Sequence, residues 1–236
     1  MVFGSPHRHF SRTDSTNTRA RELAEAGAPG GTVVTAREQS EGRGRRGRVW
    51  TAPAGKGLLY SAIQRPLDER HLLLPLSVPL AVCEAAEALR GGARCAIMWP
   101  NDVWLEERKL AGILIEARPQ EGWAVIGVGL NLSVAPQEFP EELRWPATSL
   151  GGGVSAEEAR RALDAALGRW VEADEDSVLT RWRERDALRG REVRWDGEGE
   201  ESSGVADGVD ERGNLLVVTA GGDRVALGAG EVHLRL

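Results

Sequence analysis

Three apolar segments follow one another closely in the middle of the chain, and they constrain its fold more than any other feature. They span residues 94–99, 110–117 and 123–131, and each has the length and composition of a β-strand. Their close spacing favours antiparallel neighbours in one sheet. The centre of the chain therefore predicts an antiparallel or mixed sheet.

Helical patterns lie on both sides of this sheet. A helix is expected at residues 18–26 after candidate N-cap residues at 14–17, and strands are expected at 32–36 and 57–64. An alanine-rich stretch ends near Gly91, and its regular helix is expected to begin near Pro79. Ser155 and Glu158 form a capping box that opens a helix through residue 173, and another helix is expected at 177–188.

The sequence changes character after residue 191. Short β-rich pieces separated by glycine occupy residues 192–195, 204–209, 215–219, 224–227 and 231–236. Such a tail predicts a small β-barrel behind a larger α+β unit. We therefore expect an α+β domain at residues 1–188 and a β-barrel domain at 189–236.

Composition excludes several classes of protein. A chain of 236 residues that is 41% hydrophobic can bury a core without disulfides, and its two cysteines form no metal-ligand pattern. A net charge of -6 argues against a protein that coats nucleic acid or an anionic membrane. Neither a signal peptide nor an apolar run of about 18 residues is present, so a cytoplasmic protein is expected.

The segment GRGRRGR at residues 42–48 carries four arginines in seven residues. Arginine binds phosphate and carboxylate through paired hydrogen bonds, and glycine lets the backbone fold around a ligand. An Arg/Gly run is also common in nucleic-acid-binding or disordered tails. Its position between two strands of an acidic protein favours a small anionic ligand, with a loop that is mobile until the ligand binds. Trp50 follows, and it either covers a nucleotide or packs in the core.

Three more segments carry candidate site residues. WPND ends a strand in a turn at residues 99–102. Lys109, one of only two lysines among 30 basic residues, stands at the start of KLAGILIE. Gly127 and Gly129 lie on one face of a strand, where they clear a slot for a flat ligand or for a tight packing contact.

The motifs run in order from Ser15-Thr16-Asn17 and Gln39 through GRGRRGR, WPND, KLAGILIE and GVGLNL to a β-rich tail containing Gly230-Glu231-Val232. This order of motifs resembles that of the biotin protein ligase family. The resemblance implies a class II synthetase-like catalytic domain with an SH3-like C-terminal barrel. It implies an enzyme that uses ATP and Mg²⁺ to convert biotin to biotinyl-5'-AMP. The biotin is then transferred to a lysine of the biotin carboxyl carrier protein of acetyl-CoA carboxylase or a related carboxylase.

The resemblance also assigns roles to residues. Catalytic roles are expected for Lys109 and Arg45, and a metal contact for Asp102. Biotin contacts are expected for Ser15, Thr16, Asn17, Gln39, Gly42, Arg43, Arg45, Lys109, Gly112 and Gly127. Nucleotide contacts are expected for Arg43, Arg45, Arg46, Trp50, Asn101, Lys109 and Asn131.

One residue departs from the family pattern, and several alternatives stay open. Many family members have lysine before WPND where this chain has Met98, which either removes a phosphate-binding cation or serves packing.

Only some 13 residues precede Asp14, so a DNA-binding role is not expected, nor is a membrane partner. Family members often form homodimers, which is one alternative here. Rival functions are a lipoate or octanoate ligase and an RNA-binding regulator.

Overall fold

The computed structural model describes residues 1–197, 200–229, 234 and 235. Its larger sheet has seven strands in the order β1-β2-β3-β7-β6-β5-β4, and only β1 and β2 pair in parallel. The strands are β1 (His7–Phe10), β2 (Val33–Ala36), β3 (Gly57–Gln64), β4 (Cys95–Met98), β5 (Asp102–Leu105), β6 (Arg108–Arg118) and β7 (Trp123–Asn131). The expected antiparallel arrangement in the centre is confirmed, with β5 between β4 and β6.

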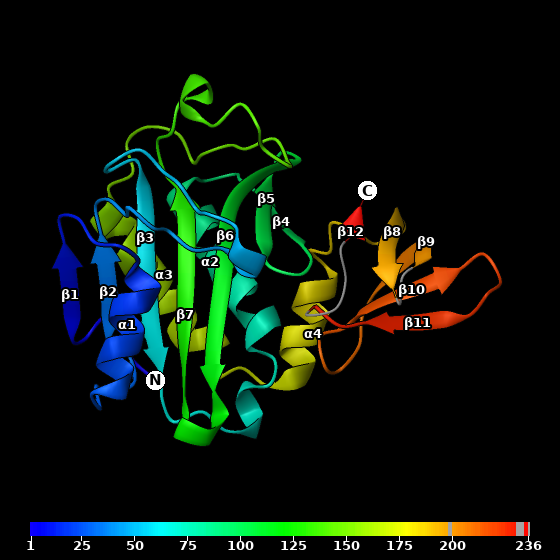
Figure 1. Cartoon of the computed structure of the whole chain (residues 1–236), viewed down its shortest axis with the longest axis horizontal. Coiled ribbons are helices and arrows are strands. Elements are labelled where there is room, and N and C mark those ends of the chain that lie inside the picture. Colours follow the sequence, from blue (N-terminus) through cyan, green and yellow to red (C-terminus); the bar gives the residue numbers. More distant parts are fainter. Residues whose placement is uncertain (198–199, 230–233, 236) are drawn as a thin grey trace.

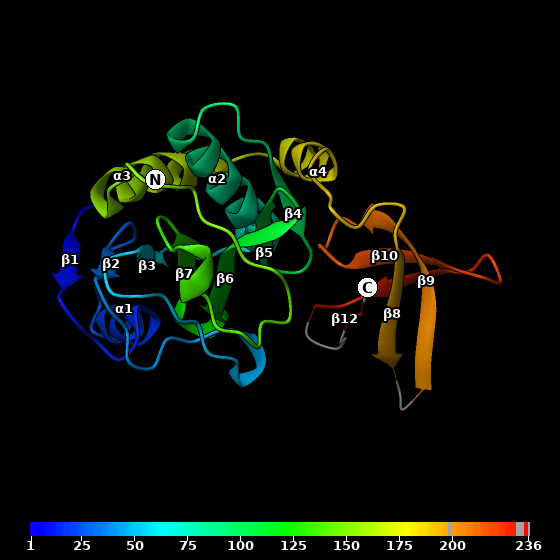
Figure 2. The same ribbon diagram turned by 90° about the horizontal axis from the view of Figure 1, so that it is seen from above.

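Helices cover the two faces of this sheet unequally (Figure 1). The helices α2 (Leu74–Leu89) and α3 (Ala156–Trp170) lie on one face, and α1 (Thr16–Glu25) lies on the other (Figure 2). In β7, Ile126 and Val128 belong to the main core, whereas Val125 packs in a smaller cluster with Ala20 and Ala24 of α1. Because α1 is short, part of the second face remains available for a binding site.

The predicted start of α2 is wrong. The helix begins at Leu74, with Pro75 in its first turn, and Pro79 lies inside it. Pro79 cannot donate a hydrogen bond to the carbonyl four residues earlier, which normally disfavours an internal proline. Almost every side chain from Leu76 to Ala86 is buried, however, and burial on this scale outweighs the missing bond.

Several other elements match or extend the sequence expectations. Ser155 caps α3 by accepting a hydrogen bond from Glu158 N at 3.2 Å, as the capping box predicts, and α4 (Glu175–Arg183) follows. The sequence pattern predicts neither β1 nor β5. β1 has the polar, mostly exposed sequence His-Arg-His-Phe, which carries no strand pattern. β5 begins within the WPND turn, two residues after Pro100, whose peptide bond to Trp99 is cis.

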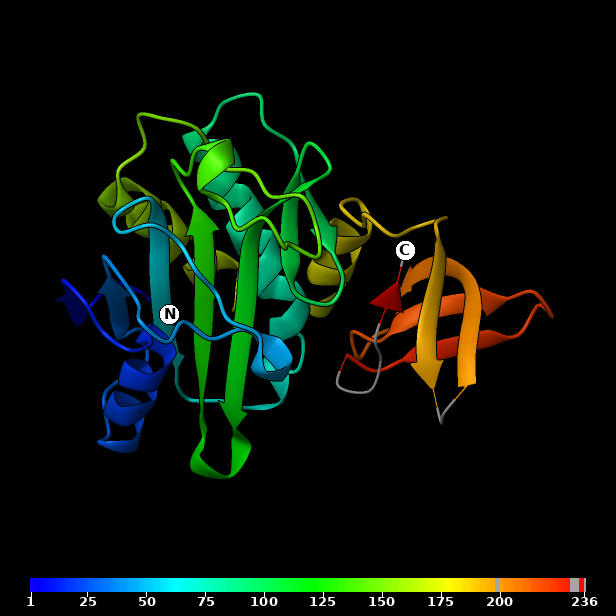
Figure 3. The same cartoon turned by 45° about the horizontal axis from the view of Figure 1, so that its top comes forward.

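A second, antiparallel sheet forms the C-terminal part of the chain (Figure 3). It comprises β8 (Glu192–Gly197), β9 (Glu200–Val209), β10 (Leu215–Thr219), β11 (Arg224–Leu227) and β12 (Leu234–Arg235), in the order β11-β10-β9-β8-β12. This agrees with the expected α+β fold and small barrel-like unit. Of the strand expected at 231–236, residues 231–233 and 236 lie outside the described residues. The exact boundary after residue 188 stays a prediction.

No helix in the described part of the chain is both long and apolar enough to span a membrane.

Candidate active site

A pocket of about 120 Å³ opens on the α1 face of the large sheet. Helix α1, the segment that follows β2, and strands β5, β6 and β7 all contribute to its wall. The residues predicted for the site that line it are Ser15, Thr16, Asn17, Gln39, Arg43, Arg45, Trp50, Asn101, Asp102, Lys109, Gly112 and Gly127. Residues far apart in the sequence are therefore brought to one place, as the motif order predicts.

Three predicted site residues do not line the pocket. Gly42 is a buried loop residue: a Cβ there would lie 2.2 Å from the Trp50 carbonyl oxygen. Arg46 has a left-handed backbone conformation with φ 56° in the short turn η1 (Arg45–Gly47). Asn131 is buried, and its Nδ2 donates to the Thr148 carbonyl at 3.0 Å. The ligand contacts assigned to these three residues stay predictions.

Neutral hydrogen-bonding groups form one end of the pocket. Thr16 donates from both N and Oγ1 to Gln39 Oε1, at 2.7 and 2.9 Å. Asn17 Nδ2 donates to Glu116 Oε2 at 2.8 Å, and Asn17 Oδ1 lies 2.6 Å from the buried Ser61 Oγ. Ser15, although it is the N-cap of α1, makes no side-chain capping bond. The N-terminal side chains of α1 therefore organise the pocket rather than cap the helix.

Sequence reasoning assigned no role to Ser61 or Glu116. Ser61 alternates with core residues along β3, so it faces the pocket side of the sheet, and Glu116 does the same in β6. That alternation is the signal from which both residues could have been inferred. Arg43 Nη2 lies 3.2 Å from Glu116 Oε1, so the Glu116 carboxylate, beside the pocket lining, links the arginine-glycine loop to Asn17 of α1.

The glycines of β6 and β7 leave room for side chains of the protein itself. A Cβ on Gly129 would lie 2.3 Å from the Trp50 indole, and one on Gly112 would lie 2.9 Å from it. A Cβ on Gly127 would lie 2.1 Å from Asn17 Oδ1. The expected slot therefore exists, and Trp50 and Asn17 pack into it. Within the described residues the Trp50 Nε1 donor is buried over Gly129 and has no hydrogen-bond partner.

Positive charge gathers at the other end of the pocket. Lys109 Nζ lies 2.8 Å from Asp102 Oδ2 and 5.6 Å from the centre of the Trp50 ring. Arg45 donates to the Ala229 carbonyl of the C-terminal unit. Burial and the neighbouring Arg46 lower the pKa of Arg45, while Asp102 opposes that shift. The two cations Lys109 and Arg45 thus share the one carboxylate of Asp102 at this end of the pocket.

Asp102 has the environment expected of a magnesium contact, although the described residues contain no cluster of three or more side chains able to hold a metal. The residue is only 9% exposed, and its Oδ1 has no hydrogen-bond partner in the described part of the chain. Mg²⁺ often takes one or two carboxylates and completes its shell with water and substrate phosphates. The residues present therefore fit Mg²⁺ bound jointly with a nucleotide.

Met98 serves packing. The Met98 side chain is buried in the main core. In the sheet, Met98 of β4 pairs with Asp102 of β5. The position therefore supplies no cation to the pocket.

The two ends of the pocket are close enough for one small ligand. The Lys109 side chain reaches Gly112, and Asn17 lies against Gly127, which pairs with Leu114. Gly112 and Leu114 are two residues apart on one face of β6, which corresponds to roughly 7 Å. The geometry suits a molecule with neutral polar groups at one end and a carboxylate at the other. The surplus of cations can then bring a second anion against that carboxylate.

Comparison with known proteins agrees with this geometry. The sequence model of the biotin/lipoate A/B protein ligase family matches residues 9–133, and that of the biotin protein ligase C terminal domain matches residues 189–235. The chain is 37% identical over 232 residues to the biotin--[acetyl-CoA-carboxylase] ligase of Paracoccus denitrificans, covering 92% of this chain and 95% of that protein. It is 39% identical over 145 residues to the bifunctional ligase/repressor of Bacillus subtilis, covering 58% of this chain and 43% of that longer protein.

A solved structure shows the same architecture. Biotin protein ligase from Aquifex aeolicus, in complex with biotin and ATP, is 30% identical to this chain. The two superpose with a TM-score of 0.80 over 98% of this chain and 99% of the other.

Proposed function

Because this chain belongs to the biotin/lipoate A/B protein ligase family, and within it to the biotin protein ligases, we propose that it activates biotin with ATP and transfers it to a carrier lysine. One observation carries the proposal. A single pocket joins a neutral hydrogen-bonding end to a cationic end that has more positive charge than Asp102 offsets.

The neutral end suits the ureido ring of biotin, which offers N–H donors and a carbonyl acceptor. Ser15, Thr16, Asn17 and Gln39 present both kinds of partner from adjacent positions. The valeryl carboxylate then points along β6 toward Lys109. This assignment rests on complementary chemistry and on the order of the lining residues.

In the first step the biotin carboxylate attacks the α-phosphorus of ATP. A carboxyl–phosphate bond forms, the bond between the α-phosphorus and its bridging oxygen breaks, and pyrophosphate leaves. Two anions must meet, so their repulsion has to be offset by fixed cations. Lys109 and Arg45 line the pocket where this charge gathers. In the second step the carrier lysine amine attacks the acyl carbon, and AMP leaves.

Asp102 would hold a magnesium ion through Oδ1, which has no partner among the described residues, while Oδ2 remains paired with Lys109. When bound, the ion offsets charge on the nucleotide phosphates. Trp50, which lines the pocket, would pack beside the nucleotide. Neither step requires a serine, cysteine or histidine nucleophile, because both nucleophiles come from the substrates.

The proposed acceptor is the carboxyl carrier protein of acetyl-CoA carboxylase, the carboxylase in the name of the Paracoccus relative. The proposed setting is the cytoplasm. Cys83 and Cys95 are free thiols, which is usual in a reducing compartment.

Mass spectrometry of the carrier tests the proposal. The protein is incubated with ATP, Mg²⁺, a carrier domain and an equimolar mixture of biotin, lipoate and octanoate. We expect biotin on one carrier lysine and only when ATP is present. Modification by lipoate or octanoate instead would favour the lipoate ligases of the same family. No modification would contradict transfer.

A further inference from the structure

Glu116 contacts the neutral end of the pocket from beside its lining. The residue lies on β6, two positions beyond the lining residue Leu114 and therefore on the same face of the strand. Asn17 Nδ2 donates to Glu116 Oε2 at 2.8 Å and to the Leu114 carbonyl at 3.4 Å. Arg43 Nη2 of the arginine-glycine loop lies 3.2 Å from the other carboxylate oxygen. One carboxylate thus contacts two residues that line the pocket.

These contacts determine which way the Asn17 amide points. A carboxylate and a backbone carbonyl only accept hydrogen bonds, so both must face the NH2 group of the amide. The Asn17 carbonyl oxygen then points the other way, where Ser61 Oγ donates to it at 2.6 Å. Asn17 is only 5% exposed and Ser61 is fully buried, so these partners decide the orientation rather than water. Glu116 therefore helps to fix the orientation of a buried amide.

The carbonyl oxygen of Asn17 is placed where a ligand can reach it. An amide oxygen accepts two hydrogen bonds, and in the described part of the chain Ser61 supplies one of them. Asn17 lines the pocket, and its Oδ1 lies over Gly127, where a Cβ would come within 2.1 Å of it. The amide oxygen therefore offers an acceptor to a ligand that lies beside Gly127.

The neighbouring amide of Gln39 offers the opposite group. Thr16 donates from both N and Oγ1 to Gln39 Oε1, so that oxygen already accepts two hydrogen bonds. The NH2 group of Gln39, which also lines the pocket, is then the part of this amide that can meet a ligand. Gln39 and Asn17 together present one donor group and one acceptor.

We propose that Glu116 is a positioning residue for biotin, because it turns the carbonyl oxygen of Asn17 toward a ureido N–H group. The inference rests on the proposed function. A ureido ring carries both N–H groups and a carbonyl oxygen, which match the acceptor of Asn17 and the donor of Gln39. A ring without N–H groups, such as the dithiolane of lipoate, loses the hydrogen bond to Asn17. Glu116 thus also contributes to the choice of substrate.

The same carboxylate also holds the arginine-glycine loop through Arg43, and a residue that only held the loop would not need Asn17. The role in orienting Asn17 is favoured by burial and distance. The bond from Asn17 is shorter, at 2.8 Å against 3.2 Å, and Asn17 is 5% exposed whereas the Arg43 side chain is 42% exposed. An exposed ion pair is screened by water, and a buried hydrogen bond is not.

The test uses the full chain with Glu116→Gln, Asn17→Asp and the double variant that combines both. Asn17→Asp brings two carboxylates together, and adding Glu116→Gln restores a donor, because the glutamine amide can donate to the new carboxylate. Glu184→Gln is the matched control, since Glu184 is an exposed glutamate of α4 that pairs with Arg181. Equilibrium dialysis gives the Kd for biotin, and biotin-dependent exchange of pyrophosphate into ATP gives kcat. Urea unfolding confirms that each variant is folded.

For Glu116→Gln we expect the Kd for biotin to rise roughly threefold to tenfold, the usual effect of one neutral hydrogen bond. The glutamine can present either end of its amide, so Asn17 loses its fixed orientation. Asn17→Asp should raise the Kd roughly a hundredfold, because like charges are brought together. The double variant should recover to about the level of Glu116→Gln. Values of kcat should stay within about twofold of wild type, since binding alone is affected, and Glu184→Gln should behave as wild type.

An unchanged Kd for biotin in Glu116→Gln would overturn the inference, and this variant decides the matter even where Asn17→Asp fails to fold. A harmless Asn17→Asp beside a damaged Glu116→Gln would assign Glu116 to the loop alone. A double variant no better than Asn17→Asp would show that the two residues do not act as a pair.

Two further results separate this inference from the proposed function. A lower kcat with an unchanged Kd for biotin would place Glu116 at the reacting groups and contradict a positioning role at the ureido ring. A wild type that binds no biotin would overturn the inference together with the proposed function, whereas biotin binding without exchange would contradict only the proposed activation.

Discussion

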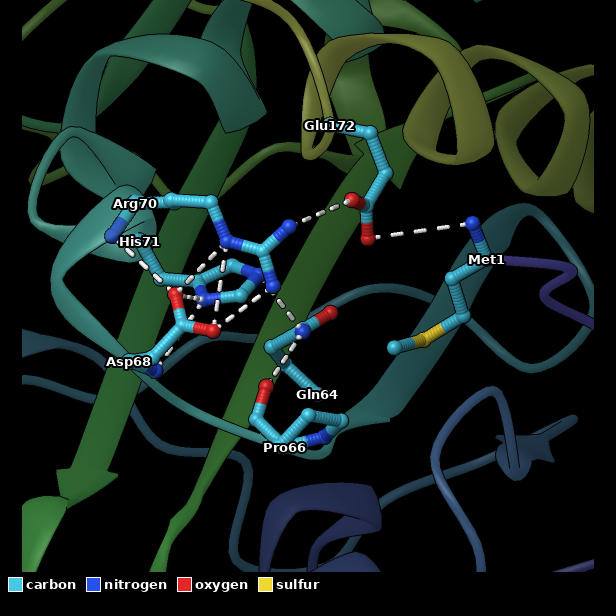
Figure 4. Close-up of polar contacts among 7 residues, drawn as sticks. All are labelled: Met1, Gln64, Pro66, Asp68, Arg70, His71 and Glu172. Carbon is cyan, nitrogen blue, oxygen red and sulfur yellow. Dashed lines mark hydrogen bonds and ion pairs between the residues drawn. The ribbon is translucent and has the colours of Figure 1, made fainter.

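Two polar clusters on opposite parts of the same sheet differ in how their charges are compensated. At the pocket, Lys109 pairs with Asp102, and the same carboxylate also acts electrostatically on Arg45. At the far end of β3 a second cluster joins the chain's N-terminus to the end of α3 (Figure 4). It consists of Met1, Gln64, Asp68, Arg70, His71 and Glu172.

In this second cluster, each charged group meets an opposite charge. Arg70 pairs with Asp68 at 2.7 Å and reaches Glu172 at 4.0 Å, while Glu172 also meets the N-terminal amine. His71 is buried and lies 3.0 Å from Asp68 Oδ1 and 2.8 Å from Gln64 Nε2. A compensated cluster stabilises the fold, whereas an uncompensated one binds a ligand of opposite charge. Substitutions in the first should affect catalysis, and those in the second should affect stability.

Lys109→Ala should have the largest effect. We expect adenylate formation to slow by roughly a hundredfold, or about 3 kcal/mol, because a fixed cation is lost where negative charge accumulates. Biotin binding should remain measurable, since the neutral end of the pocket is intact. Rapid-quench measurement of biotinyl-5'-AMP provides the readout, and Lys56→Ala is the control because Lys56 pairs with Glu138. Adenylate formation at the wild-type rate would exclude Lys109 from the mechanism.

Arg45→Gly should change the fate of the intermediate. Arg45 contacts the C-terminal unit and lines the pocket, so its loss removes a link that holds the loop over the adenylate. We expect adenylate still to form but to escape and acylate lysines of bystander proteins such as serum albumin. Mass spectrometry of a mixed-protein reaction measures this. Labelling as selective as that of the wild type would mean that Arg45 does not retain the intermediate.

His71→Leu probes the compensated cluster. Removing the imidazole leaves the buried Gln64 without one of its partners, at a cost of about 1–3 kcal/mol in the free energy of unfolding. The exchange rate per folded molecule should not change. Arg70→Gln, in the same cluster but exposed, should lower the free energy of unfolding much less, because an exposed ion pair is screened by water. Urea unfolding compares the stability of the two variants. A variant that loses activity without losing stability would contradict the assignment of this cluster to stability rather than to catalysis.

Asp68→Asn should show the smallest effect, and one that depends on pH. Hydrogen bonds from Arg70 lower the pKa of Asp68 to about 2. The carboxylate therefore stabilises the folded state above the unfolded pKa of about 4, and this contribution fades as the pH falls toward 2. Urea midpoints of wild type and variant should differ slightly at pH 7 and converge in acid. A difference that grows on acidification would contradict the assignment.

The sequence predicts the central sheet because long strands such as β6 and β7 have clear patterns, and it predicts most pocket residues because they lie in distinctive motifs. It does not predict that Trp50 fills the space above Gly112 and Gly129, since that contact joins segments far apart in the chain.

Exchange of labelled pyrophosphate into ATP tests the central claim most directly, since it reports adenylate formation without a carrier. The uncompensated cations of the pocket should support exchange that requires biotin and Mg²⁺ together. Lys109→Ala should reduce this exchange strongly, and His71→Leu should leave it intact. Exchange that proceeds without biotin, or that His71→Leu reduces as much as Lys109→Ala, would contradict the account.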